Sequence, residues 1–241
     1  MDVLETVRDL SILGTALIAI YGIDSWRRES ITRKKTELAE AALALFYEAE
    51  DAIRMIRYPG SYGSEGSTRK PGPNENLRQK EARDTAHVLI ERYLNCKKLF
   101  NRIHSIRYRF TVQFGKESTE PFDELHKLVR ILIDSARRLA EIWAKAPGNI
   151  PQEDREKHDY WREKYEAIFW EESKDDEINL SLKSIIRRIE NTCCSIILPK
   201  PTVHSFIKYP LGKISELIRK KMRTTSKPEF CKAPMGRVPG K

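Results

Sequence analysis

The sequence has few of the residues that turn-rich and sheet-rich proteins need. Only 11 of its 241 residues are glycine, whereas 33% are Asp, Glu, Lys or Arg. Strands joined by tight turns require more glycine and regular runs of β-branched residues. The composition therefore favours long, solvent-exposed helices. We expect an all-α fold in which one domain of about 170 to 200 residues carries short appendages.

The sequence also lacks the short motifs of common catalytic and metal sites. It contains no glycine-rich phosphate loop, no GxSxG, no HExxH and no CxxC. Its cysteines have neither the spacing of a disulfide framework nor that of a zinc site, and we expect reduced thiols, the helical ones buried. They are Cys96, Cys193, Cys194 and Cys231. We predict no cofactor and no metal, and the missing motifs favour a binding role over catalysis.

A helical bundle can hold a di-iron centre when two helices each supply Glu and two others each supply Glu-x-x-His. The nearest match is Asp84-Thr85-Ala86-His87, with Glu91 one turn later. A second motif of this kind is missing. We therefore interpret these residues as a solvated helix face.

Positive charge is concentrated at the C-terminal end. The chain has a net charge of +9, and from Lys200 onward 11 Lys and Arg stand against two Glu, so the preceding residues are neutral overall. A short amphipathic helix there runs into a basic cluster of Arg219, Lys220, Lys221 and Arg223. Such a segment suits anionic lipid or nucleic acid, and it is also typical of a tail that is merely solvated.

Only one long uncharged run is present, the fourteen residues from Leu10 to Ile23 between Asp9 and Asp24. Extended to Trp26 it reaches the lower limit of a membrane-spanning helix, with two aromatic residues near one end. We predict a membrane anchor, with a core helix of the body or an interfacial helix as the alternatives. The anchor residues would be Leu10, Leu13, Leu17, Ile20, Tyr21, Ile23, Trp26, Arg27 and Arg28.

The charges on either side of this run predict its orientation. The residues before it are mainly acidic, whereas Arg27, Arg28, Arg33, Lys34 and Lys35 follow it against a single Glu. By the positive-inside rule the body lies in the cytoplasm. We expect a single-pass protein of the inner (plasma) membrane, organised as an anchor at 1–28, a helical bundle at 29–198, and a basic amphipathic helix with a disordered tail at 199–241.

Apolar residues recur at steps of three and four through most of the predicted bundle, the heptad pattern of long helices that pack along one another. The pattern and the capping residues predict body helices at about 30–58, 75–114, 119–145, 152–170 and 175–198. Thr119 is the expected capping residue of the third. The loops between them are mostly short, which predicts an antiparallel bundle. The exception is 58–76, rich in Gly, Ser and Pro, which we expect to be disordered.

One stretch of the second helix interleaves basic and aromatic residues, a pattern that can bind RNA or single strands. Its candidate residues are Arg102, Arg107, Tyr108 and Arg109. The interpretation that we favour places the aromatic residues in the core and Arg102 and Arg109 on a solvated face. The apolar seam that we assign to this helix consists of Ala82, Ala86, Leu89, Tyr93, Cys96, Phe100, Ile103, Arg107, Phe110 and Phe114, and Arg107 is the one charge on it. Arg107 is expected to pair with an acidic residue of a neighbouring helix or, alternatively, to be a buried functional arginine.

Several short segments together resemble a group of uncharacterised bacterial proteins. They are Trp26-Arg27-Arg28-Glu29, Glu37-Leu38-Ala39-Glu40 leading to Phe46-Tyr47-Glu48-Ala49, Ile56-Arg57-Tyr58-Pro59, Arg107-Tyr108-Arg109-Phe110 with Phe114-Gly115, and Ile189-Glu190 with Cys193. Proteins of that group have one predicted membrane segment and a helical cytoplasmic region. The resemblance covers about residues 8–198 and implies anchoring and a bacterial origin, without any activity or catalytic residue.

These features lead to two hypotheses of function. In the first, the helical bundle of a membrane protein acts as a protein-interaction or self-association module, and its extensive heptad seams suit a homo-oligomer. In the second, the chain is a membrane-attached effector that binds nucleic acid, or an unidentified enzyme, using Arg107, Arg109 and His87.

Overall fold

The computed structural model describes residues 3–61, 63–145, 148, 150–173 and 175–198, with the backbone alone for residues 3–11, 13 and 16. This part of the chain is helical and contains no strand, as the composition predicts. Its elements are α1 (Val3–Arg57), α2 (Leu77–Phe114), the 3₁₀ turn η1 (Glu117–Thr119), α3 (Glu120–Ala144), α4 (Gln152–Phe169) and α5 (Glu177–Ile197).

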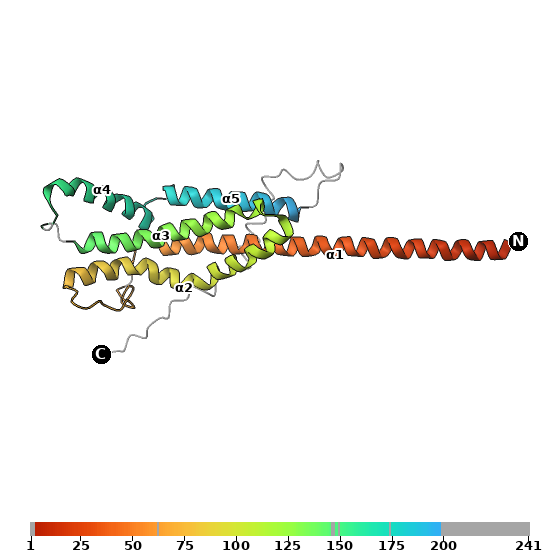
Figure 1. Cartoon of the computed structure of the whole chain (residues 1–241), viewed down its shortest axis with the longest axis horizontal. Helices are drawn as coiled ribbons and strands as arrows, with labels where there is room; N and C mark the ends of the chain where they lie inside the picture. The colour runs from red at the N-terminus through yellow and green to blue at the C-terminus, as the bar shows by residue number, and fades with distance from the viewer. Residues whose placement is uncertain (1–2, 62, 146–147, 149, 174, 199–241) are drawn as a thin grey trace.

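The first helix joins the apolar run to the body without a break. α1 is 55 residues long, and only its C-terminal part, from Leu38 onward, is buried. The N-terminal part extends beyond the other helices (Figure 1). We call residues 12–26 of this extension the α1 arm.

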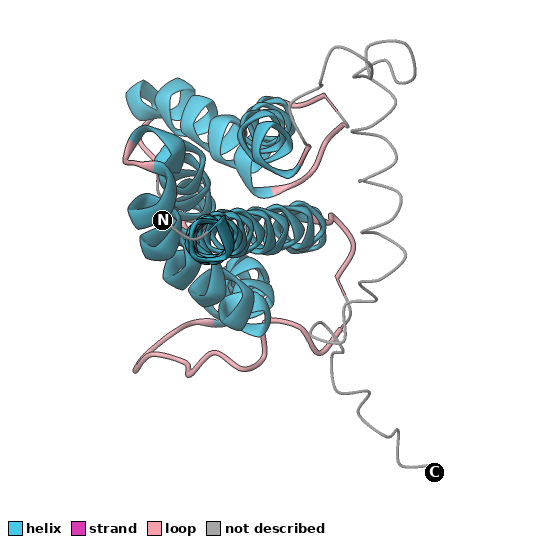
Figure 2. Cartoon of the chain, turned by 90° about the vertical axis from the view of Figure 1, so that its right-hand side faces the viewer, coloured by secondary structure: helices cyan, strands magenta, loops and turns pink. Residues whose placement is uncertain are grey.

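The remaining helices surround the buried part of α1. It packs against α2 and α5, while α3 packs against α2, α4 and α5. Figure 1 shows the chain turning back at each connection from α1 to α4, whereas α4 and α5 follow one another along the same side of the bundle. Seen along its axis, α1 lies among the other helices (Figure 2). The end of the bundle that holds α4 is therefore remote from the α1 arm.

Small residues let α1 occupy this central position. Ala39, Ala42 and Ala49 are fully buried, and an alanine on a helix face allows a neighbouring helix to approach closely. The larger side chains between them meet α2 and α3, as in the edge-on contact of Phe46 with Phe122 at 4.8 Å between ring centroids. The heptad residues predicted on α1 are thus buried within one chain.

The helix ends agree with the sequence in two places and differ in one. Asn76 forms a capping box with Gln79 at the start of α2, and Asp176 caps α5 by accepting a hydrogen bond from the Asn179 amide at 2.8 Å. Thr119, which we expected to cap α3, ends η1 instead, and its hydroxyl donates to the Lys116 carbonyl at 2.7 Å. The prediction was wrong because the 3₁₀ turn continues almost directly into α3.

We expected disorder between α1 and α2, but the described part of this loop, residues 58–61 and 63–76, is held against α2. The Gly66 amide and the Thr68 hydroxyl both donate to Glu91 of α2, each at 2.8 Å. Gly66 has φ +85°, and a Cβ there would lie 2.2 Å from the Asp84 carbonyl oxygen. The backbone can therefore approach α2 this closely only with glycine at position 66.

Candidate functional site

The α1 arm exposes an unusual amount of apolar surface. Its described large apolar side chains, Ile12, Leu17, Ile18, Ile20, Tyr21, Ile23 and Trp26, are between 60% and 75% exposed. Of the predicted anchor residues, Leu10 and Leu13 lie outside those whose side chains the structure describes, and Arg27 and Arg28 are exposed. Arg28 pairs with Asp24 at 3.0 Å. The core-helix alternative is therefore wrong for the described residues of the arm, since no other element covers them.

The apolar residues of the arm do not form a single stripe. At about 3.6 residues per turn, the seven positions point to all sides of the helix. Within the part of the chain that the structure describes, no helix is both long enough and apolar enough to cross a membrane.

The basic and aromatic segment of α2 is divided by the fold. Arg107 is half-buried and pairs with Asp123 of α3 at 2.8 Å, which confirms the expected ion pair with a neighbouring helix. Arg102 lies 3.6 Å from Glu48 of α1. Tyr108 is exposed, and its hydroxyl lies 3.2 Å from the Nε2 atom of His104. Arg109 is also exposed. Two of the three arginines thus form ion pairs between helices.

A fully buried arginine that we did not predict joins three helices. Arg57 ends α1 with 0% exposure, and its guanidinium donates to the carbonyls of Ala167, Ile168 and Trp170 at the end of α4. It also forms a bidentate pair with Asp176 at 2.9 and 3.0 Å. Bidentate pairing and bonds to free helix-end carbonyls are the arrangement that offsets the cost of burying this charge.

Arg92 of α2 plays a similar part at the start of the α1–α2 loop, where the loop leaves α1. It is 7% exposed, and it donates to the Tyr58 carbonyl at 2.6 Å and to Glu65 at 2.6 and 3.2 Å. The buried charge of α2 is thus Arg92, whereas we had placed Arg107 on the buried seam. Both structural arginines stabilise the fold around the C-terminal end of α1.

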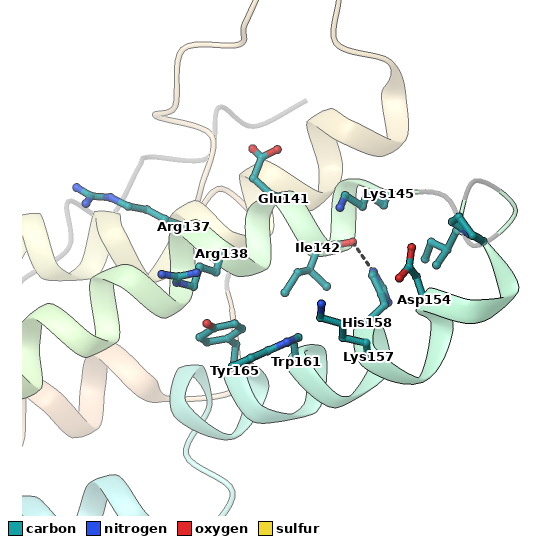
Figure 3. Close-up of a pocket in the computed structure, with 12 residues that line it drawn as sticks. Arg137, Arg138, Glu141, Ile142, Lys145, Asp154, Lys157, His158, Trp161 and Tyr165 are labelled. Atoms are coloured by element: carbon teal, nitrogen blue, oxygen red, sulfur yellow. Dashed lines mark hydrogen bonds between the residues drawn. The ribbon is translucent and has the colours of Figure 1, made fainter.

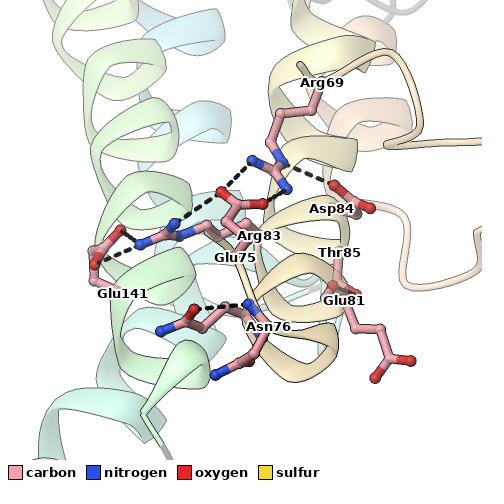
Figure 4. Close-up of polar contacts among 9 residues, drawn as sticks. Arg69, Glu75, Asn76, Glu81, Arg83, Asp84, Thr85 and Glu141 are labelled. Atoms are coloured by element: carbon pink, nitrogen blue, oxygen red, sulfur yellow. Dashed lines mark hydrogen bonds and ion pairs between the residues drawn. The ribbon is translucent and has the colours of Figure 1, made fainter. Parts of the chain in front are cut away.

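The loop is also held by a network of charges (Figure 4). Glu75 accepts hydrogen bonds from Arg69 at 2.6 and 2.9 Å and from Arg83 at 2.8 Å, and Arg83 lies 3.3 Å from Glu141 of α3. The hydrogen bonds from Arg69 and Arg83 lower the pKa of Glu75 to about 2. Glu75 is therefore ionised across the physiological range and links the loop to α2.

The residues of the nearest di-iron match have structural partners. Asp84 accepts from Arg69 at 2.8 Å, and Glu91 binds the loop amide described above. Our interpretation as a solvated face was wrong for Asp84 and Glu91, because both bind the loop, whereas Thr85 is exposed and His87 is partly buried. The described residues contain no group of three His, Cys, Asp or Glu side chains placed to hold a metal ion.

Two of the described cysteines are buried, as expected for thiols on helix seams. Cys96 and Cys193 are buried, and Cys194 is partly buried. Burial raises the pKa of the Cys193 thiol to about 12. Cys231 and the basic cluster of Arg219, Lys220, Lys221 and Arg223 lie outside the described residues.

A groove of about 820 Å³ lies between α3 and α4, at the end of the bundle remote from the arm. We call it the ring groove. Figure 3 shows Trp161 and Tyr165 of α4 on one side and Arg138 and Ile142 of α3 on the other. The two rings are stacked, with centroids 5.6 Å apart and planes at 20°. The Arg138 guanidinium lies 5.6 Å from the centroid of Tyr165.

A second hollow of about 460 Å³ adjoins the ring groove and shares Ile142, Lys145, Ile150 and His158 with it. We call it the cationic hollow. Its lining includes four cations against one carboxylate, Asp159. The cations are Arg78, Lys145, Arg155 and Arg162. The sequence gives little warning of either cavity, because the lining residues come from separate helices.

Comparisons of the chain with protein-family models, with curated proteins and with solved structures give no match.

Proposed function

We propose that this chain is a membrane-attached binding protein. The segment from Leu10 to Trp26, which contains the α1 arm, inserts into the inner (plasma) membrane as a single-pass anchor. The helical bundle, antiparallel from α1 to α4, binds a protein partner on the cytoplasmic side. The observation that carries the proposal is the exposure of every described large apolar side chain of the arm. Contiguous apolar surface of this kind is typical of sites that contact lipid or another protein.

The distribution of these residues favours lipid over a second copy of the chain. A coiled-coil partner covers one narrow stripe of a helix, whereas lipid tails surround it. The arm has apolar residues on all sides, and Ile12, Ile18 and Ile20 each point in a different direction. A dimer through the arm would leave much of this surface in water.

The end of the arm also suits a membrane interface. Tyr21 and Trp26 are 72% and 71% exposed, at the position where aromatic rings contact headgroups. The basic residues from Arg27 to Lys35 follow directly, where they attract anionic lipid. Moving the five exposed Ile and Leu side chains of the arm out of water contributes at most about 8 to 15 kcal/mol, at 1.5 to 3 kcal/mol per residue.

The bundle is the part that binds a partner. Since the heptad residues of α1 are buried within one chain, self-association through these seams would require the bundle to open. We therefore assign partner binding to the outer surface of the bundle. The part of that surface farthest from the arm is the end of the bundle that holds α4 (Figure 1).

Membrane fractionation of the full chain tests the attachment. The arm variant carries Ile18→Lys and Ile20→Lys. The matched control, Leu94→Lys with Val112→Lys, places the same charges at exposed apolar sites of α2. Each lysine costs about 2.5 to 3.5 kcal/mol near the bilayer centre. The unmodified chain and the control should stay in the membrane pellet after high salt and carbonate, while the arm variant should become soluble.

Two results would contradict the proposal. Release of the unmodified chain by salt alone would mean that the arm does not insert. If the unmodified chain is instead a soluble dimer, and the arm variant a monomer by light scattering, the arm is a protein interface. Circular dichroism of both variants checks that the bundle remains folded.

A further inference from the structure

The ring groove presents aromatic faces that the core does not use. Trp161 is 37% exposed, although a tryptophan of a small bundle would be stabilised by deeper burial. Its ring is parallel to that of Tyr165, and the Lys164 ammonium lies 5.1 Å from its centroid. Stacked rings flanked by cations form a platform on which another flat ring can stack.

Cations outnumber carboxylates around the ring groove: Glu141 and Asp154 also line it, but Glu141 pairs with Arg83. Among the described residues, Arg138, Lys145 and Lys157 of the ring groove form no ion pair. In the cationic hollow only Arg162 does so, with Asp159 at 3.5 Å. Cations that form no ion pair attract an anionic ligand.

The two cavities meet at a common edge. Ile142, Lys145 and His158 line both of them, and the His158 ring nitrogen Nε2 lies 3.4 Å from the Ile142 carbonyl oxygen. A ligand that spans this edge would place a flat apolar group on the rings and several negative charges among the cations. The ring groove, at about 820 Å³, lies in the size range of small-molecule sites.

We propose that the two cavities together form a nucleotide-binding site. The base stacks on Trp161 and Tyr165 with Arg138 alongside, and the phosphates lie in the cationic hollow near Lys145. A nucleotide joins a flat ring to phosphate anions, and the two adjoining cavities offer rings in one and cations in the other, whereas an acidic peptide needs no ring platform. The site is independent of the membrane attachment proposed above, because its residues belong to α3, α4 and the start of α2.

Calorimetric titration of the full chain in detergent micelles tests the site with four probes: ATP, AMP, adenosine and inorganic phosphate. ATP should bind more tightly than AMP, and AMP more tightly than adenosine, because each phosphate adds contacts with cations. Raising the salt concentration should weaken ATP binding more than adenosine binding. Failure of all four probes to bind at millimolar concentration would overturn the proposal.

Two pairs of variants locate the site. Trp161→Ala should weaken ATP and adenosine about ten-fold, since base stacking on an aromatic ring is removed. Its control, Tyr108→Ala, removes a ring of α2 that is 57% exposed and does not line the groove. Lys145→Ala should weaken ATP about ten-fold and leave adenosine unchanged, with Lys127→Ala as the control on the exposed side of α3.

Equal effects of a variant and its control would place nucleotide binding elsewhere on the chain. A single-stranded oligonucleotide that binds far more tightly than ATP, and loses affinity in Trp161→Ala, would show that the groove binds a nucleic acid strand rather than a free nucleotide. Displacement of ATP by an acidic aromatic peptide at lower concentration would assign the groove to a protein partner. Either result overturns the proposal.

Discussion

Replacing Arg57 with methionine removes the one fully buried charge that links α1 to α4 and α5. Methionine keeps the length of the apolar stem but provides no donor. The substitution breaks six hydrogen bonds, and it leaves Asp176, whose side chain is 11% exposed, without its counter-charge. Three carbonyls at the end of α4 lose their donor as well.

The expected loss of stability follows from leaving the Asp176 carboxylate without a partner. Removing one partner of a buried ion pair destabilises a protein by about 3 to 5 kcal/mol, mainly because the remaining charge has no partner. For a domain of this size, each kcal/mol lowers the melting temperature by about 2 to 4 °C, so Arg57→Met should lower it by about 6 to 20 °C.

The assay is urea and thermal unfolding of the full chain in detergent micelles, followed by helical circular dichroism. The control is Arg137→Met, because Arg137 is 69% exposed and has only a surface ion pair, with Asp134 at 3.5 Å. Its effect should stay below about 1 kcal/mol. Equal destabilisation by both variants would refute the reasoning.

A second variant separates the charge of the pair from the helix cap. Asp176→Asn preserves the capping hydrogen bond that the Asn179 amide donates, since Asn and Asp are comparable caps. It removes only the negative charge that faces Arg57. We expect a loss of about 2 to 3 kcal/mol, and a double variant with Arg57→Met that is less destabilised than the sum of the two changes.

Three further predictions concern the loop and the buried thiol. Gly66→Ala should destabilise the bundle by about 2 kcal/mol or more, because of the positive φ and the clash with α2; Gly63→Ala, which meets no atom within 4 Å, should have little effect in the same unfolding assay. The ion pairs of Glu75 lower its pKa to about 2, so their stabilisation is complete above the unfolded pKa of about 4.5 and is lost as the pH falls toward 2. Unfolding of Glu75→Gln against the unmodified chain should thus show a difference that shrinks between pH 5 and pH 2, and a constant difference would contradict the assignment. Cys193, whose pKa burial raises to about 12, should resist iodoacetamide at pH 8 until urea unfolds the chain, as mass spectrometry of the labelled peptides can show.

A heptad pattern was insufficient to predict which face of α2 is buried. From Leu89, a first step of four leads to Tyr93 and a first step of three leads to Arg92. The two stripes that result both contain mostly apolar residues. We chose the stripe through Tyr93, Phe100 and Arg107, whereas the structure buries the one through Arg92, Leu99 and Ile106. An arginine on a stripe argues against burial unless acceptors are available, and those acceptors come from α1 and the loop.

The prediction of disorder for residues 58–76 was wrong because the structure of this loop, too, depends on contacts with residues distant in the sequence. Gly, Ser and Pro indicate the absence of regular structure, and the loop indeed has none. Order came from charged partners on α2, above all Glu91 and Asp84, which are too far along the chain for a local pattern to reveal.

The sequence by itself determined the helical class, the positions of most helix ends and the exceptional apolar run at the start of α1, because periodicity, caps and composition are local properties. Only the tertiary structure decided that the described part of this run is exposed, that Arg57 and Arg92 are buried, and that α3 and α4 form the ring groove. Each of these depends on which acceptors, rings and charges separate helices bring together. Burial and site geometry are therefore set by packing between segments distant in the chain.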